Sequence, residues 1–407
     1  MNDLIIPKLR NDIVFDFVED EVNGRHIVLF DPSGYADRPV YLPGFFLDML
    51  KLLNGELSIN ELNKTVSETL NLDFDDSFFL ELFKHLDENC FLETPRFNWR
   101  KYDIDKYLES PKRNYVCGGS TYPLEYAQLK ESLDKLLDCK EATNASQNAK
   151  AIIVPHIDFN IGAQANSTYS TAYNAIKNTD ADLFVIFGTS HYGNSDLFML
   201  TKKDFETPLG LVENDKELIS FMQRDRMPRI TIDDLSHRNE HSIELQAVIL
   251  KHLFAGKEFK ILPVLCGSFN NFIRDNTLPN SERKFVDFID KLKQGIETLG
   301  RKAVFIASAD FAHIGRKFGD NFDATQVLEN VKNEDMDLIN QLENCNHDAF
   351  FKLVTEEKDK RKICGLSPIY SMLQTVKPSK GHFLKYEQWN EVATKSAVSF
   401  ASLSFYE

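Results

Sequence analysis

The sequence has no long hydrophobic run and no closely paired cysteines. None of its 407 residues lies in a stretch approaching the roughly 18 apolar residues that a membrane-spanning helix needs. Charges interrupt the apolar residues at the start, unlike a secretory leader. The six cysteines are scattered without a CxxC pair, whereas disulfide frameworks belong mainly to small secreted domains. We therefore expect a cytoplasmic protein with free thiols and no membrane contact.

An excess of positive charge is also missing. The chain has 47 Lys and Arg against 62 Asp and Glu, a formal net charge of -15. Binding to phosphate backbones needs a concentrated cationic face, so nucleic acid is not an expected partner. The acidity is uneven, because residues 1–145 carry a net charge of -11 and the other 262 residues only -4. A partner of the N-terminal part should therefore present a basic surface, and added salt should weaken that association.

The length predicts two domains, because single hydrophobic cores stop growing near roughly 250–300 residues. Residues 1–105 show one strand-like run and three amphipathic helical patterns, which indicate a small winged-helix-like α+β domain. The second of these helices should begin at Ser58, since Ser58 and Glu61 form a capping-box pattern. Residues 106–147 are polar and are interpreted as a connecting segment, with a flexible joint at 142–148.

Residues 148–407 follow a different pattern, in which short β-branched or aromatic runs alternate with longer helical periods. This alternation is typical of a layered α/β fold. The expected strands are 151–154, 183–187, 259–265, 303–306 and 396–405. The expected helices are 163–178, 240–254, 282–298, 324–343 and 366–376.

Three histidines follow three of the expected strands: His156, His191 and His313. In open α/β sheets, ligands bind outside the carboxyl ends of the strands, where loops converge. A single histidine in such a loop is more often an ordinary hydrogen-bonded residue, but three at equivalent places favour a shared site. Imidazole is also the commonest metal ligand among side chains. The same loops carry the carboxylates of Asp158 and Asp310.

Two further segments add candidate side chains. His241 and Glu244 are three residues apart at the start of an expected helix and therefore share one face of it. Glu244 has an alternative role, which is to stabilise the helix N-terminus through the helix dipole. Cys364 precedes another expected helix, whose N-terminal amides should lower the thiol pKa and favour a metal-binding or nucleophilic thiolate. Cys266 ends a strand and is interpreted as a packing residue.

An ordered set of motifs in residues 148–407 resembles a known family. The motifs are PHIDFNIGAQANSTYSTAY, FGTSH, TPLGLVENDKEL, NEHSIELQ, ILPVLCG, SADFAHIG and ICGLSPI. In this order they resemble the Memo family, in the form called AmmeMemoRadiSam system protein B. Memo proteins are similar in fold to the class III extradiol ring-cleaving dioxygenases, which use non-haem Fe(II). The resemblance thus implies a dioxygenase-like layered α/β domain.

The resemblance also implies roles for individual residues. His156, His191 and Cys364 match the metal ligands, and His313 matches the acid/base of the dioxygenases. Asp310 and His241 match further residues of the catalytic pocket, near which Asp158 and Glu244 would add carboxylates. Fe(II) is the expected metal, with copper or zinc as alternatives, because a thiolate stands where the dioxygenases have a carboxylate.

The sequence departs from the animal Memo pattern at three motifs. PHIDF replaces PHAGY, so that Asp158 is an added carboxylate. CGLSPI replaces CGRHPI, which loses a histidine at Ser367, and SADFAHIG replaces SSDFCHWG, which loses a cysteine and a tryptophan. The ligand residues are kept, so these changes are expected to alter the selectivity of the pocket.

Residues 1–105 resemble the PqqD family of small peptide-recognition domains. There, a peptide binds by adding a strand to the edge of a sheet. The resemblance implies that this domain recruits a peptide or a radical-SAM protein. A purely structural or dimerising winged helix is an equal alternative, and the oligomeric state stays open.

The function that we expect is a metal-dependent redox protein, namely an O2-using oxidoreductase with His313 as acid/base. One alternative is a non-enzymatic metal- or peptide-binding partner of a radical-SAM system. A second is a zinc hydrolase with His313 or Glu244 as the base.

Overall fold

The computed structural model describes residues 5–20, 24–36, 38–70, 74–138, 149–193, 195–225 and 227–407. The chain divides into two compact units, Met1–Ser110 and Pro111–Glu407, and each is described by itself. The flexible joint expected at 142–148 lies outside the described residues. Among the residues that are described, no helix has the length and apolar character needed to cross a membrane.

The first unit is a three-stranded antiparallel sheet with helices. Its strands lie in the order β1 (Val14–Asp20), β2 (Gly24–Phe30) and β3 (Val40–Pro43). The helices are α1 (Phe46–Leu50), α2 (Ile59–Leu70), α3 (Asp76–Glu88) and α4 (Pro95–Glu109). The predicted capping box is confirmed, since Ser58 N donates to Glu61 Oε2 and Glu61 N donates to Ser58 Oγ. Strands β1 and β3 were not predicted.

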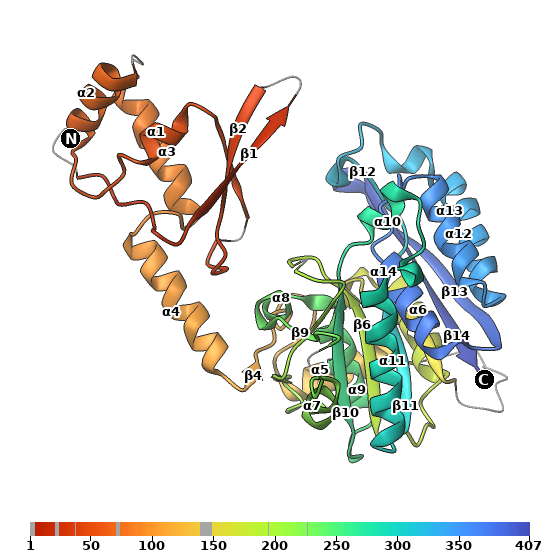
Figure 1. The fold of residues 1–407 in the computed structure, drawn as a ribbon. Helices are drawn as coiled ribbons and strands as arrows, with labels where there is room; N and C mark the ends of the chain where they lie inside the picture. The colour runs from red at the N-terminus through yellow and green to blue at the C-terminus, as the bar shows by residue number, and fades with distance from the viewer. Residues whose placement is uncertain are drawn as a thin grey trace. The chain divides into compact units, whose positions relative to one another are not determined.

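The second unit is a layered α/β structure around a large mixed sheet, as the sequence predicts (Figure 1). At its centre four parallel strands lie side by side in the order β5 (Ala151–Val154), β11 (Ala303–Ser308), β6 (Leu183–Thr189) and β10 (Lys260–Cys266). Antiparallel strands extend the sheet at both sides. Beyond β5, β14 (Ser396–Tyr406) pairs with β5, and β13 (Lys380–Glu391) and β12 (His313–Gly315) pair with β14. Beyond β10, β7 (Phe198–Leu200) pairs with β10. β9 (Thr231–Ile232) pairs with β7.

Helices cover both faces of this sheet because successive strand residues point to opposite sides. In β5, Ala151 and Ile153 join one apolar cluster, whereas Ile152 and Val154 join the other. Helices α7 (Lys216–Met222), α11 (Arg283–Thr298), α12 (Leu328–Glu343), α13 (His347–Glu356) and α14 (Leu366–Val376) contribute to the first cluster. Helices α5 (Tyr126–Leu136), α6 (Ala163–Asn174) and α9 (His241–Leu253) contribute to the second.

The expected connecting segment needs correction. Residues 106–109 end α4, whereas the described residues 111–138 belong to the second unit. There β4 (Lys112–Arg113) pairs with β8 (Asp204–Phe205), and α5 buries Leu129 and Leu133 completely. The sequence shows an amphipathic stretch near residues 124–137, and the structure forms it as α5, whose apolar side packs on the sheet layer.

Burial of a histidine in α8 (Asp234–Arg238) makes the stability of the second unit depend on pH. The ring of His237 is 1% exposed and its Nε2 donates to Met199 O at 2.9 Å. Burial, with a smaller contribution from the Arg113 cation, lowers the pKa of His237 from its ordinary 6.5 to about 4. Because the folded state favours the neutral ring, unfolding takes up a proton when the pH lies between about 6.5 and about 4.

We therefore predict that His237 stabilises the fold fully above about pH 6.5, and that this contribution falls by up to about 3 kcal/mol as the pH drops to about 4. Urea unfolding of wild type and His237→Gln at a series of pH values measures the difference, since glutamine keeps a donor but does not titrate. The free energies of unfolding of the two proteins should converge as the pH falls. A constant difference between pH 8 and pH 4.5 would contradict the prediction.

Candidate metal centre

Three neighbouring parallel strands each deliver a polar side chain two residues beyond their last residue. His156 follows β5, which ends at Val154; Asp310 follows β11, which ends at Ser308; and His191 follows β6, which ends at Thr189. Because β5, β11 and β6 are adjacent and parallel, these three loops meet at one edge of the sheet. The sequence predicts that His156, His191 and His313 converge; the structure brings the loops of His156 and His191 together with that of Asp310, whereas His313 lies further along the chain, at the start of β12.

His156 is buried and held in one orientation. Its ring Nδ1 lies 3.0 Å from Ser308 O, a carbonyl that can only accept, so the tautomer we assign carries its proton on Nδ1. The free Nε2 then faces Cys364 Sγ at 3.4 Å. Burial, followed by the proximity of His241 and His191, lowers the pKa of His156 well below its ordinary value. The ring is consequently neutral, as a metal-binding imidazole must be.

His191 and His241 share one buried carboxylate, that of Glu240. The side chain of Glu240 accepts from His191 N at 2.7 Å and from His191 Nδ1 at 2.9 Å, and it lies 3.3 Å from His241 Nδ1. Burial opposes its charge, but the hydrogen bond and positive charge of His191 outweigh burial and lower the pKa of Glu240 to about 2. Glu240 therefore orients the His191 ring through Nδ1 and lies close to the His241 ring, and its hydrogen bond and charge outweigh burial and raise the pKa of His191.

Two glycines allow the elements around the centre to approach closely. A Cβ on Gly188 would lie 2.7 Å from both Ser242 Oγ and Ile243 Cγ1, so any larger residue would push α9 away from β6. A Cβ on Gly365 would lie 2.5 Å from Asp310 O, so a larger residue there would push Cys364 away from the loop that follows β11. Both glycines thus set distances between ligand-type side chains.

The ligand-type atoms form two overlapping groups among the described residues. The first is His156, His191 and Cys364 and the second is His191, Glu240 and His241, and in each group the ligand atoms lie within 4.8 Å of one another. The rings of His156 and His191 are perpendicular, with centroids 5.2 Å apart. Since both Glu240 oxygens already accept from His191, the first group is the better candidate for a three-ligand face, and a metal ion held there would keep positions for water or substrate.

Cys364 differs from the expectation in its protonation. It precedes the N-cap Gly365 of α14 and does not lie in the helix itself. Burial, together with the negative charge of Asp310, raises the pKa of the Cys364 thiol well above its ordinary value. The predicted lowering by helix amides is therefore wrong for the metal-free protein, and a cation has to displace the thiol proton.

Asp310 is buried, whereas His313 is partly exposed, and their contacts differ. Asp310 Oδ1 accepts from His156 N at 3.1 Å, its Oδ2 lies 3.6 Å from His156 Nε2, and burial raises its pKa to about 7. His313 opens β12 and donates from Nδ1 to Phe311 O at 3.1 Å. Burial lowers the pKa of His313 to about 4, with a smaller effect from His191. His313 belongs to neither ligand group, so the structure places it beside the centre.

The two added carboxylates do not join the centre. Asp158 is exposed and caps the short helix η1 (Phe159–Ile161), accepting from Asn160 N at 2.8 Å. The Glu244 carboxylate is fully buried and pairs with the Arg113 guanidinium, and it also accepts from Tyr122 OH at 2.6 Å and from Cys117 N at 2.8 Å. The expected pocket role of Glu244 is thus replaced by a structural one.

Sequence reasoning missed Glu240, Arg113 and Ser308. Arg113 donates to the carbonyls of Glu240 and His237 at 2.6 and 2.9 Å, so it fixes the backbone on which Glu240 and His241 stand. Ser308 Oγ donates to Ser242 O and ties β11 to the same turn of α9. Glu240 could have been found, because glutamate is not among the preferred N-cap residues and its place directly before His241 indicates another role.

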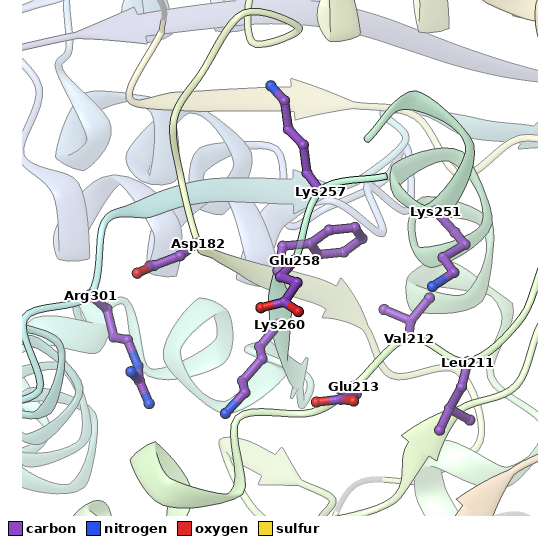
Figure 2. A pocket seen from close by; sticks show the side chains of 10 residues that line it. Asp182, Leu211, Val212, Glu213, Lys251, Lys257, Glu258, Lys260 and Arg301 are labelled. Carbon is purple, nitrogen blue, oxygen red and sulfur yellow. The ribbon is translucent and has the colours of Figure 1, made fainter. Parts of the chain in front are cut away.

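A cavity of about 450 Å3 lies at the other end of the sheet and does not belong to the centre. Figure 2 shows its lining, which includes Asp182 before β6 and Lys260 at the start of β10. Charges of both signs surround it, and Arg301 is paired with Asp215 at 2.7 Å. It opens at the amino ends of strands whose carboxyl ends carry His191 and Cys266.

Comparisons with known proteins agree with this architecture. Residues 113–404 match the model of a family described as Memo-like protein. A MEMO1 family protein of Aquifex aeolicus is 27% identical over 98% of this chain and all of its own length. MEMO1 family proteins of Pyrococcus abyssi and Methanosarcina mazei are 30% and 28% identical over 71% and 70% of this chain, and over 97% and 96% of their own lengths. The latter two matches are about as long as the second unit.

The buried Arg113–Glu244 pair generates a prediction about stability. Glu244→Gln leaves the Arg113 charge in a site where both side chains are at most 1% exposed, so we expect a loss of about 3–5 kcal/mol in the free energy of unfolding. Urea unfolding followed by Trp389 fluorescence in a Trp99→Phe background reports the second unit, since Trp99 is an exposed residue of α4.

The matched control is Asp180→Asn, which breaks the exposed Asp180–Lys302 pair and should not shift the unfolding midpoint. Equal midpoints for Glu244→Gln and Asp180→Asn would show that the buried pair does not stabilise the fold.

Proposed function

The chain belongs to the Memo-like protein family, and from this premise we propose that it is a metal-dependent redox protein that uses non-haem iron(II). The observation that carries the proposal is the approach of His156 Nε2, His191 and Cys364 Sγ to within 4.8 Å of one another. Both histidines are oriented through their Nδ1 atoms, which is the arrangement that metal-binding histidines commonly have. Two imidazoles and one thiolate suit iron, copper or zinc.

The residues around the ligands have separate tasks in this proposal. Bound iron would supply one-electron chemistry and open positions at which O2 and substrate meet. Asp310, with a pKa of about 7, can hold a proton on its carboxyl beside His156. His313 is neutral near pH 7, so its free ring nitrogen can accept a proton from a substrate and return it. The family likeness is what assigns His313 this acid/base role.

Metal content provides the first test. Full-length protein purified without oxygen should contain about one equivalent of metal, and His156→Ala, His191→Ala and Cys364→Ser should each weaken its binding by at least about tenfold. Glu240→Gln should weaken it by about 10- to 100-fold without removing a ligand, because the amide orients His191 less well. Elemental analysis and competition with a chelator measure both effects.

His252→Ala is the matched control, since His252 pairs with Asp134 on the surface, and this variant should keep its metal. Stoichiometric metal that persists when His156 and His191 are both alanine would contradict the ligand assignment. Iron with metal-dependent oxygen consumption supports the redox function. Zinc without oxygen consumption, together with turnover of esters or amides, would support the hydrolase alternative.

A second candidate function is recruitment of a partner through the first unit. Strand β1 lies at an edge of the three-stranded sheet, and Val14, Phe15 and Val18 on it are 53%, 50% and 44% exposed. An exposed apolar edge strand can pair with an extended peptide. We propose a peptide segment, such as one of a radical-SAM protein, that carries basic residues to match Asp16 and Glu19.

Proline substitution distinguishes pairing at this edge from a purely structural role. Consecutive residues of an edge strand direct their N–H groups alternately to the neighbouring strand and outward. Of Phe17→Pro and Val18→Pro, one should therefore destabilise the first unit and the other should leave it folded but lower peptide affinity by about tenfold or more. The measurement is fluorescence polarisation with extended peptides of alternating apolar and lysine residues, at increasing salt.

Binding that survives in the folded proline variant, or that does not respond to salt, would contradict strand addition.

A further inference from the structure

A second, smaller cavity borders the metal centre on the side of Cys364. It has a volume of about 200 Å3 and lies between the carboxyl ends of β6 and β10, the short helix α10 (Asn270–Asp275) and the start of α14. Thr189 and Ser190 contribute to its wall directly before His191, and Cys364 contributes on the opposite side. Two segments that carry proposed metal ligands therefore meet in the wall of one pocket.

The backbone at Cys364 and Gly365 is held in place beside this cavity. Thr189 Oγ1 donates to Cys364 O at 2.9 Å, and Gly365 N donates to Asp310 O at 3.0 Å. Cys364 Sγ lies 3.4 Å from His156 Nε2, and the residue also lines the cavity. A molecule in the cavity would thus contact Cys364, one member of the first ligand group.

The lining restricts what such a molecule can be. Its apolar part comes from buried Phe269, Ile363 and Leu366, and its polar part from the hydroxyl and amide groups of Ser367 and Asn270. This combination fits an apolar body that carries a neutral hydrogen-bonding group.

The charged groups of the cavity do not favour a charged ligand. They are one carboxylate, Asp359, and one ammonium, Lys362. Asp359 accepts from Ile363 N at 2.8 Å, and Lys362 Nζ pairs with Asp320 at 2.7 Å. Because Asp359 and Lys362 have opposite charges and already have partners, the cavity offers no net charge to a ligand. Its volume is below the roughly 300–1,000 Å3 of drug-sized pockets, which limits the ligand to a small molecule.

We propose that this cavity is the substrate pocket of the centre, and that it binds a compact, uncharged molecule with an apolar body and one hydroxyl or amide group. The proposal rests on the proposed function, because it assigns a substrate class to the same metal centre. The pocket is nevertheless tested on metal-free protein, so that the pocket proposal and the metal-centre proposal can be contradicted independently.

The test measures how fast thiol reagents reach Cys364 in the full-length, metal-free chain, with peptide mass mapping to distinguish it from other cysteines. Uncharged methyl methanethiosulfonate should label Cys364 at least about fivefold faster than its sulfonate and trimethylammonium analogues. Benzamide should protect Cys364, whereas benzoate and protonated benzylamine should not.

Two tryptophan variants provide the steric control. Asn270 lines the cavity at its exposed rim, and Asn271 is its exposed neighbour in α10 that does not line it. Asn270→Trp should slow labelling of Cys364 by about tenfold or more and abolish protection by benzamide, whereas Asn271→Trp should behave as wild type.

Equal labelling in Asn270→Trp and wild type, or equal protection by benzamide and benzoate, would overturn the pocket. Metal analysis of the same variants, purified without oxygen and before their metal is removed for labelling, separates the two proposals. If the protein binds no metal but shows the predicted labelling, the pocket is supported and the redox function is contradicted. If the protein binds iron but Cys364 is labelled equally fast in both tryptophan variants, the metal centre is supported and this pocket is contradicted.

Discussion

The arrangement of the centre depends on the buried carboxylate of Glu240. A carboxylate that is 1% exposed is costly unless several donors satisfy it, and here the donors are His191 N, His191 Nδ1 and Ser242 N, the last at the start of α9. The helix N-terminus stabilises the anion, and the anion in turn orients the ring of His191 and lies 3.3 Å from His241 Nδ1. The same Glu240 carboxylate therefore caps α9 and orients a candidate ligand side chain.

Glu240 is itself held by a segment that precedes the sheet in the chain. The chain enters the second unit at Pro111, and two residues later Arg113 binds the carbonyls of His237 and Glu240 and the carboxylate of Glu244. Because the Arg113 side chain is fully buried and its hydrogen bonds go to His237 on α8, to the N-cap Glu240 and to Glu244 on α9, a shift of this segment would move Glu240 and with it His191. Arg113 thus contributes both to the stability of the fold and to the geometry of the centre.

The sequence allowed much of the sheet and most of the centre to be predicted. The central strands, and the histidines that follow β5 and β6, are local features, since alternating runs and a side chain beyond a strand end can be read within a few residues. The roles of Arg113 and Glu244 could not be read, because their contact spans 131 residues of sequence. The protonation of Cys364 was misjudged for a related reason: the neighbouring helix is visible in the sequence, whereas the burial that raises the thiol pKa is created by distant segments. Strand β1 was missed because residues on both of its faces are exposed, so it lacks the usual alternation.

The protonation states around the ligands make the centre better suited to a cation than to an anion. His156 is neutral, the Cys364 thiol keeps its proton, and burial raises the pKa of Asp310 to about 7. The site has thus lost charge through burial, and Glu240, its one strongly ionised carboxylate, is already satisfied by His191. A divalent cation would restore the ionised forms of Cys364 and Asp310, and their two negative charges would balance its own without help from solvent. An anion would raise the cost of ionising the same two groups, and the raised pKa of His191 would offset its charge only in part, because Glu240 already pairs with that ring.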